Sequence, residues 1–544
     1  VQCVPFNNIP FNFSLVNHNP PIADLLDCID SSERTHELFA RLIKNNTEQR
    51  GILYTSKADI VGFKNPEELA EKYNNVLYHR HQYARIEIFK NHFYIKEYDE
   101  NVYEIIYKLK KYAESGIKNY THSVDLWMKN SGLIIDCDEK KNALRNLFKN
   151  SKVAFIYGAA GTGKSTMINY ISSLFKDKQK IFLANTNPAV ENLRRKVTAE
   201  HAEFVTITKF LSKDVSNDCD ILCLDECSTI SNRDMVRVLQ RAQCKLLVLV
   251  GDIYQIESIL FGNWFNIAYK VMPKDSVAEL TRPHRTTVQG LIEVWNKVRE
   301  ITEDRLEFIT RNGLSSTLDE SIFSRTEEDE IVLCLNYDGI YGINNINKFL
   351  QSNNVNPSIN WGVLSYKVGD PVLFNESNRF APLVYNNLKG KILQIEEEED
   401  CIYFTIEVYT VLNELDVIGF DLELKESVTD ETSVIRFKVG RGGDGNDDND
   451  NVENVVPFQV AYAISIHKAQ GLEYESVKVV ITSEIEEMVS HNIFYTAITR
   501  AKSKLKIYWS PETEKRILEN MKVQFNDKDY QLFKAKYKEA LLKS

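Results

Sequence analysis

The stretch Gly158-Ala159-Ala160-Gly161-Thr162-Gly163-Lys164-Ser165-Thr166 decides the fold of this chain. An apolar run from Val153 to Tyr157 precedes it and predicts a buried strand, and Met167 to Phe175 carry apolar side chains at helical spacing. A strand, a glycine-rich loop ending in Gly-Lys-Ser and a helix are together typical of a phosphate-binding loop. Backbone N–H groups of such a loop converge on phosphate oxygens, and the helix N-terminus adds partial positive charge.

Two side chains of this loop carry most of its expected chemistry. Lys164 is expected to reach the β- and γ-phosphates of a nucleotide, and the Ser165 hydroxyl is expected to hold Mg²⁺. The alternative is a glycine-rich turn without a ligand, but the complete strand–loop–helix context argues against it. The residues expected to contact the nucleotide are Gly158, Ala159, Ala160, Gly161, Thr162, Gly163, Lys164, Ser165 and Thr166.

The bulk composition is that of an ordinary globular protein. The 544 residues are 43% hydrophobic and 26% charged, which allows three or four domains. The net charge of −11 excludes a basic nucleic-acid coat, so any nucleic-acid contact must come from a local track. No apolar run approaches the roughly 18 residues of a membrane span. The first residues do not resemble a secretory signal, and nine scattered cysteines fit a reducing cytoplasm better than a disulfide framework.

Polar residues follow each of the next apolar runs. Ile181 to Ala184 leads into Asn185, Asp220 to Leu224 leads into Asp225-Glu226, and Lys245 to Val250 leads into Gly251-Asp252. Short apolar strands alternating with helices predict a parallel sheet with ligands at the carboxyl edge of its strands. A zinc site from Cys219, Cys223 and Cys227 is rejected, because four strand residues span roughly 13 Å.

The pair Asp225-Glu226 is a candidate catalytic centre. A carboxylate at a strand end beside a phosphate loop can hold Mg²⁺, and a second carboxylate can orient the attacking water. We assign these roles to Asp225 and Glu226, respectively. Gln255 is a candidate γ-phosphate sensor, and Arg285 is a candidate cationic finger, because phosphoryl transfer needs charge neutralisation in the transition state.

The second half of the chain predicts another α/β unit that is interrupted by strands. Ile331 to Leu335 reads as a strand with a helix to Leu350, and Lys367 to Val439 alternates as in a small antiparallel β-barrel. An acidic, glycine-rich loop follows Arg441. The α/β pattern then resumes with strands at Val477 to Thr482 and Leu505 to Trp509.

Taken together, residues 133 to 510 resemble the superfamily 1 helicases. The phosphate loop is similar to motif I of that family, Asp225-Glu226-Cys227-Ser228 to motif II and Gly251-Asp252-Ile253-Tyr254-Gln255 to motif III. The remaining similarities are Thr186-Asn187-Pro188 to Ia, Thr206-Ile207-Thr208 to Ib, Leu280 to Arg285 to IV, Ser465 to Gly471 to V and Tyr495 to Arg500 to VI. Ser-Ile-His-Lys-Ala-Gln-Gly and the β-barrel insertion resemble the RecD/Dda-like (superfamily 1B) branch, which moves 5′ to 3′, whereas Leu472-Glu473-Tyr474 looks more like the opposite-polarity UvrD branch.

The resemblance implies an α/β fold with two RecA-like parallel-sheet domains in tandem, ATP between them, an SH3-like barrel insertion and an extra N-terminal α+β domain. It implies that Arg285 and Arg500 reach the γ-phosphate from the second domain, with Gly471 and Glu473 also at the nucleotide. The implied single-strand contacts are Thr186, Asn187, Pro188, Thr206, His467 and the barrel. The expected boundaries are 1–130 (N-terminal, of unknown role), 131–278 (1A), 279–365 (2A, first part), 366–455 (barrel and acidic loop), 456–511 (2A, second part) and 512–544 (lysine-rich helical tail, a solvated face).

Two departures from the family pattern qualify these expectations. The adenine-reading glutamine of the family would fall near Lys140, where this chain has none. Only Ser212 to Cys219 is available for the strand-splitting hairpin between motifs Ib and II, so translocation is a safer prediction than unwinding.

The main functional hypothesis is an ATP- and Mg²⁺-dependent translocase or helicase on single-stranded DNA, with RNA left open. The alternative is a nucleotide-switched regulatory NTPase acting through a protein partner of residues 1–130. A P-loop kinase or transferase would leave motifs III to VI unexplained.

Overall fold

The computed structural model describes residues 33–48, 50–159, 161–212, 217–254, 261–282, 286–375, 379–380, 383–427, 429–441, 454–485, 489–521 and 527–538. Ala160, Gln255, Arg285 and the acidic loop after Arg441 lie outside these ranges, so the expectations for them stay predictions. Within the described ranges, no helix combines the length and apolar character needed to cross a bilayer.

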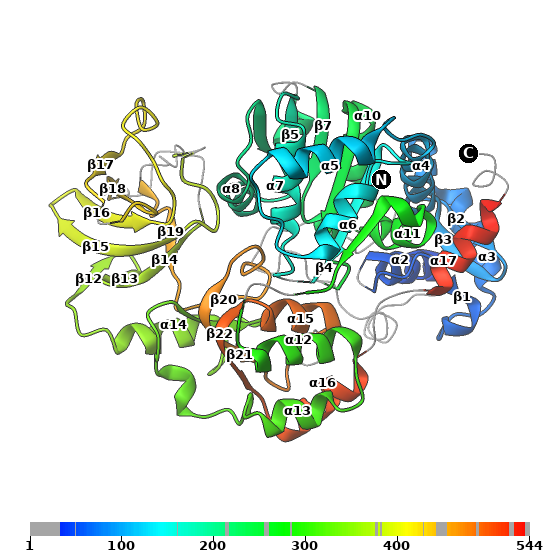
Figure 1. Ribbon diagram of the computed structural model, residues 1–544. Helices are drawn as coiled ribbons and strands as arrows, with labels where there is room; N and C mark the ends of the chain where they lie inside the picture. Colours follow the sequence, from blue (N-terminus) through cyan, green and yellow to red (C-terminus); the bar gives the residue numbers. More distant parts are fainter. Residues whose placement is uncertain are drawn as a thin grey trace.

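The sheet that carries the phosphate loop, here called lobe 1, has six parallel strands in the order β6-β5-β7-β8-β4-β9 (Figure 1). Along β4, Phe155 and Tyr157 enter one hydrophobic core while Ala154 and Ile156 enter another, so both faces of the sheet are covered. Its strands are β4 Val153–Gly158, β5 Lys180–Ala184, β6 Ala202–Thr206, β7 Asp218–Leu224, β8 Gln243–Gly251 and β9 Val277–Leu280. Its helices are α6 Asp138–Asn146, α7 Lys164–Leu174, α8 Asn187–Lys196, α9 Ile207–Leu211, α10 Asn232–Arg241 and α11 Trp264–Val271.

The N-terminal region builds a small α+β unit beside lobe 1. A three-stranded antiparallel sheet, in the order β1-β3-β2, packs with α2 and α3 around its own core. The long helix α4 buries Val102, Ile105 and Leu109 in the core of lobe 1, so this unit and lobe 1 are joined by packing. The elements are α2 Thr35–Glu48, β1 Thr55–Ser56, α3 Pro66–Val76, β2 Ile86–Phe89, β3 His92–Ile95 and α4 Lys96–Ala113. The next helix, α5 Tyr120–Asn130, buries Tyr120 and Val124 in a core of lobe 1.

A second parallel sheet, lobe 2, has the order β10-β22-β21-β11-β20. Lobe 2 lies below lobe 1 in Figure 1. Two parallel-sheet domains in tandem, as predicted, are therefore present. The elements are α12 Gln289–Glu300, α13 Arg305–Arg311, β10 Ser315–Ser316, β11 Glu330–Cys334, α14 Ile343–Ser352, β20 Ala463–Ser465, β21 Tyr474–Val480, α15 His491–Ile498, β22 Ala501–Tyr508 and α16 Pro511–Asn520.

The inserted β-domain is a six-stranded antiparallel sheet in the order β17-β18-β16-β15-β14-β19. Its entry strand β14 pairs with its exit strand β19, so the insertion leaves lobe 2 and returns to it at one place. This pairing extends the domain past the expected limit of residue 455. The strands of this sheet are β14 Pro371–Phe374, β15 Lys389–Glu397, β16 Cys401–Val408, β17 Glu423–Lys425, β18 Ser433–Gly440 and β19 Phe458–Val460. Just before it in the chain, β12 Ser358–Trp361 and β13 Leu364–Lys367 form a separate two-stranded antiparallel sheet.

The expected solvated tail after residue 512 is wrong. Helix α16 buries Ile517 and Leu518 in lobe 2, whereas α17 (Asp527–Lys536) crosses to the N-terminal unit and buries Phe533. Asp529 accepts hydrogen bonds from the backbone N–H groups of Leu53 and Tyr54 at 2.7 and 3.1 Å. The lysine content did not reveal this role, and one of the lysines, Lys536, takes part in it by donating to Asp99 of α4 at 2.6 Å.

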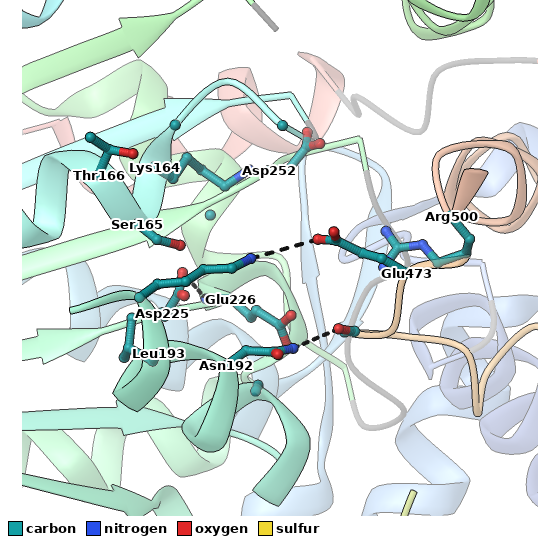
Figure 2. Close-up of a pocket in the computed structure, with 16 residues that line it drawn as sticks. Lys164, Ser165, Thr166, Asn192, Leu193, Asp225, Glu226, Asp252, Glu473 and Arg500 are labelled. Carbon is teal, nitrogen blue, oxygen red and sulfur yellow. Dashed lines mark hydrogen bonds and ion pairs between the residues drawn. The ribbon is translucent and has the colours of Figure 1, made fainter. Parts of the chain in front are cut away.

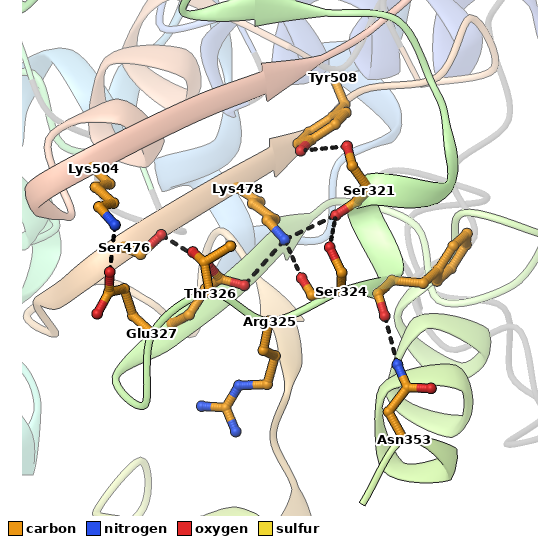
Figure 3. Close-up of polar contacts among 12 residues, drawn as sticks. Ser321, Ser324, Arg325, Thr326, Glu327, Asn353, Ser476, Lys478, Lys504 and Tyr508 are labelled. Carbon is orange, nitrogen blue, oxygen red and sulfur yellow. Dashed lines mark hydrogen bonds and ion pairs between the residues drawn. The ribbon is translucent and has the colours of Figure 1, made fainter.

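A buried ion pair fixes the segment that leads into β11. Lys478 on β21 lies 3.0 Å from Glu330 on β11, and both side chains are less than 10% exposed (Figure 3). Thr326 and Ser476 donate to the other carboxylate oxygen of Glu330 at 2.8 and 2.9 Å, and Lys478 also donates to the backbone oxygen of Ser321 at 2.9 Å. Each charged group therefore has partners, and removing either one would leave the other buried without an opposite charge.

We expect Lys478→Met to lower the free energy of unfolding of lobe 2 by about 3–5 kcal/mol, because Glu330 would stay buried without its cation. Urea unfolding followed by tryptophan fluorescence measures this change. The matched control is Lys504→Met on the neighbouring strand, whose exposed pairing with Glu327 contributes less than about 1 kcal/mol. Equal losses in the two variants would contradict the assignment.

Candidate active site

A polar cavity of about 330 Å³ lies between the two lobes, and residues from both of them line it (Figure 2). Lobe 1 contributes the phosphate loop, helix α8 and the ends of β7 and β8, and lobe 2 contributes the loop before β21 and the end of α15. Of the residues predicted from the sequence, those lining the cavity are Gly161, Gly163, Lys164, Ser165, Thr166, Asp225, Glu226, Gly471, Glu473 and Arg500.

The phosphate loop is held in shape by its own polar groups. Lys164 Nζ donates to the carbonyl oxygens of Gly158 and Ala159 at 2.8 and 2.9 Å, and Thr162 Oγ1 donates to Ala159 at 3.0 Å. Helix α7 begins at Lys164, directly after Gly163. The cation and the helix N-terminus therefore face the same cavity, as the sequence pattern predicts.

Lys140 supports this loop from behind. Its side chain is 1% exposed, and Nζ pairs with Asp136 at 2.5 Å. Gly163 has φ +85°, and a Cβ added there would lie 2.5 Å from Lys140 Nζ. Only glycine fits this position, because both the backbone conformation and the neighbouring ammonium exclude a side chain.

The two acidic residues stand where β7 ends. Glu226 has φ +51°, a conformation that costs a non-glycine residue energy, and its N–H donates to Asp225 Oδ1 at 2.9 Å. Burial raises the pKa of Asp225. Burial, followed by the charge of Asp225, raises the pKa of Glu226 to about 7, against the opposing charges of Arg500 and Lys164. Glu226 is thus poised to exchange a proton near neutral pH.

Asp252, at the end of β8, is a further cavity residue, to which the sequence analysis assigned no individual role. Its Oδ1 accepts the N–H of Tyr254 at 3.0 Å, whereas its buried Oδ2 has no hydrogen-bond partner in the described part of the chain. A buried carboxylate oxygen without a partner is costly unless a cation or a water completes it. This oxygen and Asp225 give the cavity the oxygen donors that Mg²⁺ prefers.

Arg500 brings a guanidinium from lobe 2 into the cavity. It is 3% exposed and donates to the backbone oxygens of Thr496 and Leu472 at 3.0 and 3.2 Å and to Thr499 Oγ1 at 3.3 Å. These bonds hold the side chain at the end of α15. The cationic groups predicted for the two lobes, Lys164 and Arg500, therefore line one cavity.

Helix α8 connects the lobes through two residues that the sequence analysis missed. Asn192 Nδ2 donates to the carbonyl oxygen of Gly471 at 2.7 Å, and Lys196 lies 3.7 Å from Glu473 (Figure 2). The available signal was their spacing of four residues, which places both on one face of the helix. Spacing alone could not show that lobe 2 lies opposite that face.

The residues expected to contact nucleic acid are divided between the lobes. Thr186 and Thr206 follow the paired strands β5 and β6, and each caps a helix by accepting a backbone N–H, from Ala189 and Lys209 respectively. Asn187 is exposed beside Thr186, and His467 is exposed on lobe 2. Pro188 is buried and lines a second cavity, described below.

The fold and the cavity define a class of protein. Two parallel-sheet lobes, a phosphate loop on the first and an arginine from the second in one cavity are the arrangement of an ATP-hydrolysing enzyme of the DNA helicase type. Comparisons with known proteins agree. Residues 137–319 match the family described as AAA domain, and residues 460–508 match the UvrD-like helicase C-terminal domain.

Three relatives show the range of similarity. The RecBCD enzyme subunit RecD of Buchnera aphidicola (subsp. Schizaphis graminum) is 23% identical over 71% of this chain and 78% of its own length. The ATP-dependent DNA helicase Pif1 of Campylobacter jejuni is 23% identical over 65% of this chain and 88% of its own. The uncharacterized protein MJ1519 of Methanocaldococcus jannaschii is 24% identical over 68% of this chain, which spans only 37% of that protein.

A solved structure, Pif1 helicase from Bacteroides in complex with ADP-AlF3 and ssDNA, aligns with 75% of this chain and 98% of that chain. Its sequence identity is 17% and its TM-score is 0.43. The two domain matches and the RecD and Pif1 relatives confirm the predicted resemblance to the RecD/Pif1-like branch (1B) of the superfamily 1 helicases.

Proposed function

We propose that this chain hydrolyses ATP in the cavity between the lobes and uses each cycle to move along single-stranded DNA in the 5′ to 3′ direction. The observation that carries the proposal is the shared cavity: Lys164 and Glu226 from lobe 1 and Arg500 from lobe 2 line one space. A site assembled from two lobes is completed or broken by their relative motion, which couples hydrolysis to movement.

Each cavity residue has a proposed role in hydrolysis. Lys164 and the loop N–H groups hold the β- and γ-phosphates. Glu226 accepts a proton from the attacking water as its oxygen bonds to the γ-phosphorus, and the bond to the β,γ-bridging oxygen breaks to release ADP and phosphate. Arg500 neutralises the charge that develops on the transferred group. Gln255 and Arg285 are proposed to assist as γ-phosphate sensor and second finger.

Ser165 and Asp225 are proposed to hold Mg²⁺. Both line the cavity, as does Asp252, whose Oδ2 has no hydrogen-bond partner among the described residues; these carboxylate and hydroxyl oxygens fit a divalent cation. When bound, Mg²⁺ would neutralise charge on the β- and γ-phosphate oxygens.

The strand is proposed to cross both lobes at the surface formed by Thr186, Asn187, Thr206 and His467. The capped N-termini of α8 and α9 follow neighbouring strands of one sheet, so Thr186 and Thr206 share an edge of lobe 1. The inserted β-domain, as a counterpart of an SH3-like barrel, is proposed to cover the strand. Similarity to the DNA helicase Pif1 supports DNA as the polymer. The resemblance of Ser465 to Gly471 to the RecD/Dda-like branch supports 5′ to 3′ as the direction.

The test is an ATPase assay with and without single-stranded DNA. We expect many-fold stimulation by the strand and loss of turnover in Lys164→Ala. Equal turnover with and without nucleic acid, together with nucleotide-dependent capture of a protein by residues 1–130, would instead favour a regulatory NTPase. Tailed duplexes with a streptavidin-displacement control then separate movement from unwinding and one direction from the other.

A further inference from the structure

A second cavity, of about 390 Å³, lies next to the nucleotide cavity and shares Asn192, Lys196, Gly471 and Glu473 with it. Three parts of the molecule close it: the α8 side of lobe 1, the inserted β-domain and the last strand of lobe 2. The distinctive side chains are Arg195 from α8, Tyr385, Lys389 and Tyr409 from the β-domain, and Lys502 from β22. The family resemblance implies a nucleotide role for Gly471 and Glu473 and a strand role for Pro188, but it assigns no individual role to Arg195, Tyr385, Lys389, Tyr409 or Lys502.

Cationic side chains gather in the second cavity. Four of them line it, Arg195, Lys196, Lys389 and Lys502, together with the carboxylates of Glu431 and Glu473. Three of the four already have a carboxylate nearby: Glu473 lies 3.7 Å from Lys196, Glu191 3.7 Å from Arg195 and Asp329 2.7 Å from Lys389. Within the described residues Lys502 has no carboxylate within 4 Å, so an anion entering the cavity is attracted chiefly to it, and low-dielectric walls strengthen that attraction.

Lys389 is held in place for such a contact. Its ammonium lies 2.7 Å from Asp329 and 4.1 Å from the centre of the Tyr474 ring, at the wall between the β-domain and lobe 2. Burial lowers the pKa of Lys389, and the nearby charge of Lys502 acts in the same direction while Asp329 opposes it. Two lysines that repel each other across one cavity are both stabilised when an anion enters.

Tyr409 gives the cavity an aromatic surface. Its side chain is 40% exposed, and its backbone oxygen accepts a hydrogen bond from Arg195 of α8, which joins the β-domain to lobe 1. An exposed ring beside cationic groups is the combination that binds nucleotides, because a base stacks on the ring while the phosphate meets the charges.

We propose that the second cavity binds a nucleoside phosphate, with its base on Tyr409 and its phosphate between Arg195, Lys389 and Lys502. This nucleoside phosphate is either one nucleotide of a single strand or a free nucleotide. Pro188, at the beginning of α8, lines the same cavity and follows the proposed strand contacts Thr186 and Asn187. If the bound nucleoside phosphate belongs to a single strand, this inference rests on the proposed function.

The first arm of the test measures binding of a short labelled oligothymidylate by fluorescence anisotropy over a range of salt concentrations. We expect Lys502→Gln to weaken binding and to reduce the slope of log Kd against log salt by about 0.7, the value for one phosphate contact on a single strand. We expect Tyr409→Ala to weaken binding about 5- to 100-fold, and Tyr409→Phe to restore it because the ring remains.

The second arm counts bound nucleotides by equilibrium dialysis with a fluorescent ADP analogue. A second, weaker binding event in the unchanged chain that Lys502→Gln removes identifies a free nucleotide as the source. The matched control in both arms is Lys504→Gln, two residues further along β22 and outside the cavity.

If Lys502→Gln and Tyr409→Ala match Lys504→Gln in both arms, the inference is overturned. If the unchanged chain neither binds the oligonucleotide nor shows strand-stimulated turnover, the proposed function fails instead. In that case the number of bound nucleotides still shows whether the second cavity binds a nucleoside phosphate. The failure of the inference can therefore be distinguished from the failure of the proposed function.

Discussion

Arg500→Ala is expected to lower kcat for ATP by about 10³–10⁵-fold, the usual contribution of an arginine that stabilises the transition state of phosphoryl transfer. The guanidinium is buried, lines the cavity opposite the phosphate loop and is fixed by hydrogen bonds to Thr496, Leu472 and Thr499. Because it is fixed in advance, little reorganisation opposes its action. Steady-state turnover with saturating single-stranded DNA measures the effect.

The control for Arg500→Ala must separate chemistry from folding, since this arginine also ties segments of lobe 2 together. Arg305 suits that purpose, because it too donates to backbone oxygens within lobe 2, those of Leu518 and Thr302, and does not line the cavity. Arg305→Ala is expected to keep turnover within a few-fold. If both variants lose turnover equally, the loss reports lobe 2 folding and the role of Arg500 is wrong.

Lobe 1 could be predicted from the sequence because its signals are local. The phosphate loop, the apolar strands and the polar residues at their carboxyl ends are each contained in fewer than ten neighbouring residues. Parallel pairing then brings the strand ends together without further information. For this reason Lys164, Ser165, Asp225 and Glu226 meet in one cavity as expected.

The parts that the sequence did not predict depend on contacts between distant segments. Asn192 and Lys196 join the two lobes only because Gly471 and Glu473 of lobe 2 lie opposite α8. The inner face of α17 could not be matched with the N-terminal unit, because more than 400 residues separate Asp529 from Leu53. A hydrophobic pattern shows that one face of a helix is buried, but it does not show which segment packs against that face.

Lys140 marks a different limit of sequence analysis. A motif comparison registers it only as a missing glutamine, whereas in the fold its buried ammonium lies against Gly163 and pairs with Asp136. Its function in the structure is to support the loop. The role of Lys140, where the chain departs from the family pattern, therefore became clear only from the residues around it in the fold.

Glu226→Gln is expected to lower kcat by about 10²–10⁴-fold while leaving nucleotide affinity within a few-fold, because an amide keeps the size of the side chain but cannot accept the proton of water. Turnover in the presence of single-stranded DNA measures the first quantity, and titration with a fluorescent ADP analogue measures the second. The matched control is Glu475→Gln, two residues after the cavity residue Glu473 and outside the cavity, where the side chain accepts a hydrogen bond from Ser503.

The pH dependence of kcat/KM gives this prediction a sharper check, since that ratio reports the free enzyme. Burial and Asp225 disfavour the charged form of Glu226 and raise its pKa to about 7. Below that pH the carboxyl is protonated and cannot act as a base, so kcat/KM should fall with decreasing pH and level off above it. Glu226→Gln should abolish this acid limb.

The two predictions are coupled through charge. Arg500 is the foremost of the cations that oppose the rise in the pKa of Glu226, so its removal leaves burial and Asp225 less opposed. The residual activity of Arg500→Ala should therefore show its acid limb at a higher pH than that of the unchanged chain. An acid limb that survives in Glu226→Gln, or that does not move in Arg500→Ala, would mean that the titrating base is another group and that Glu226 does not activate the water.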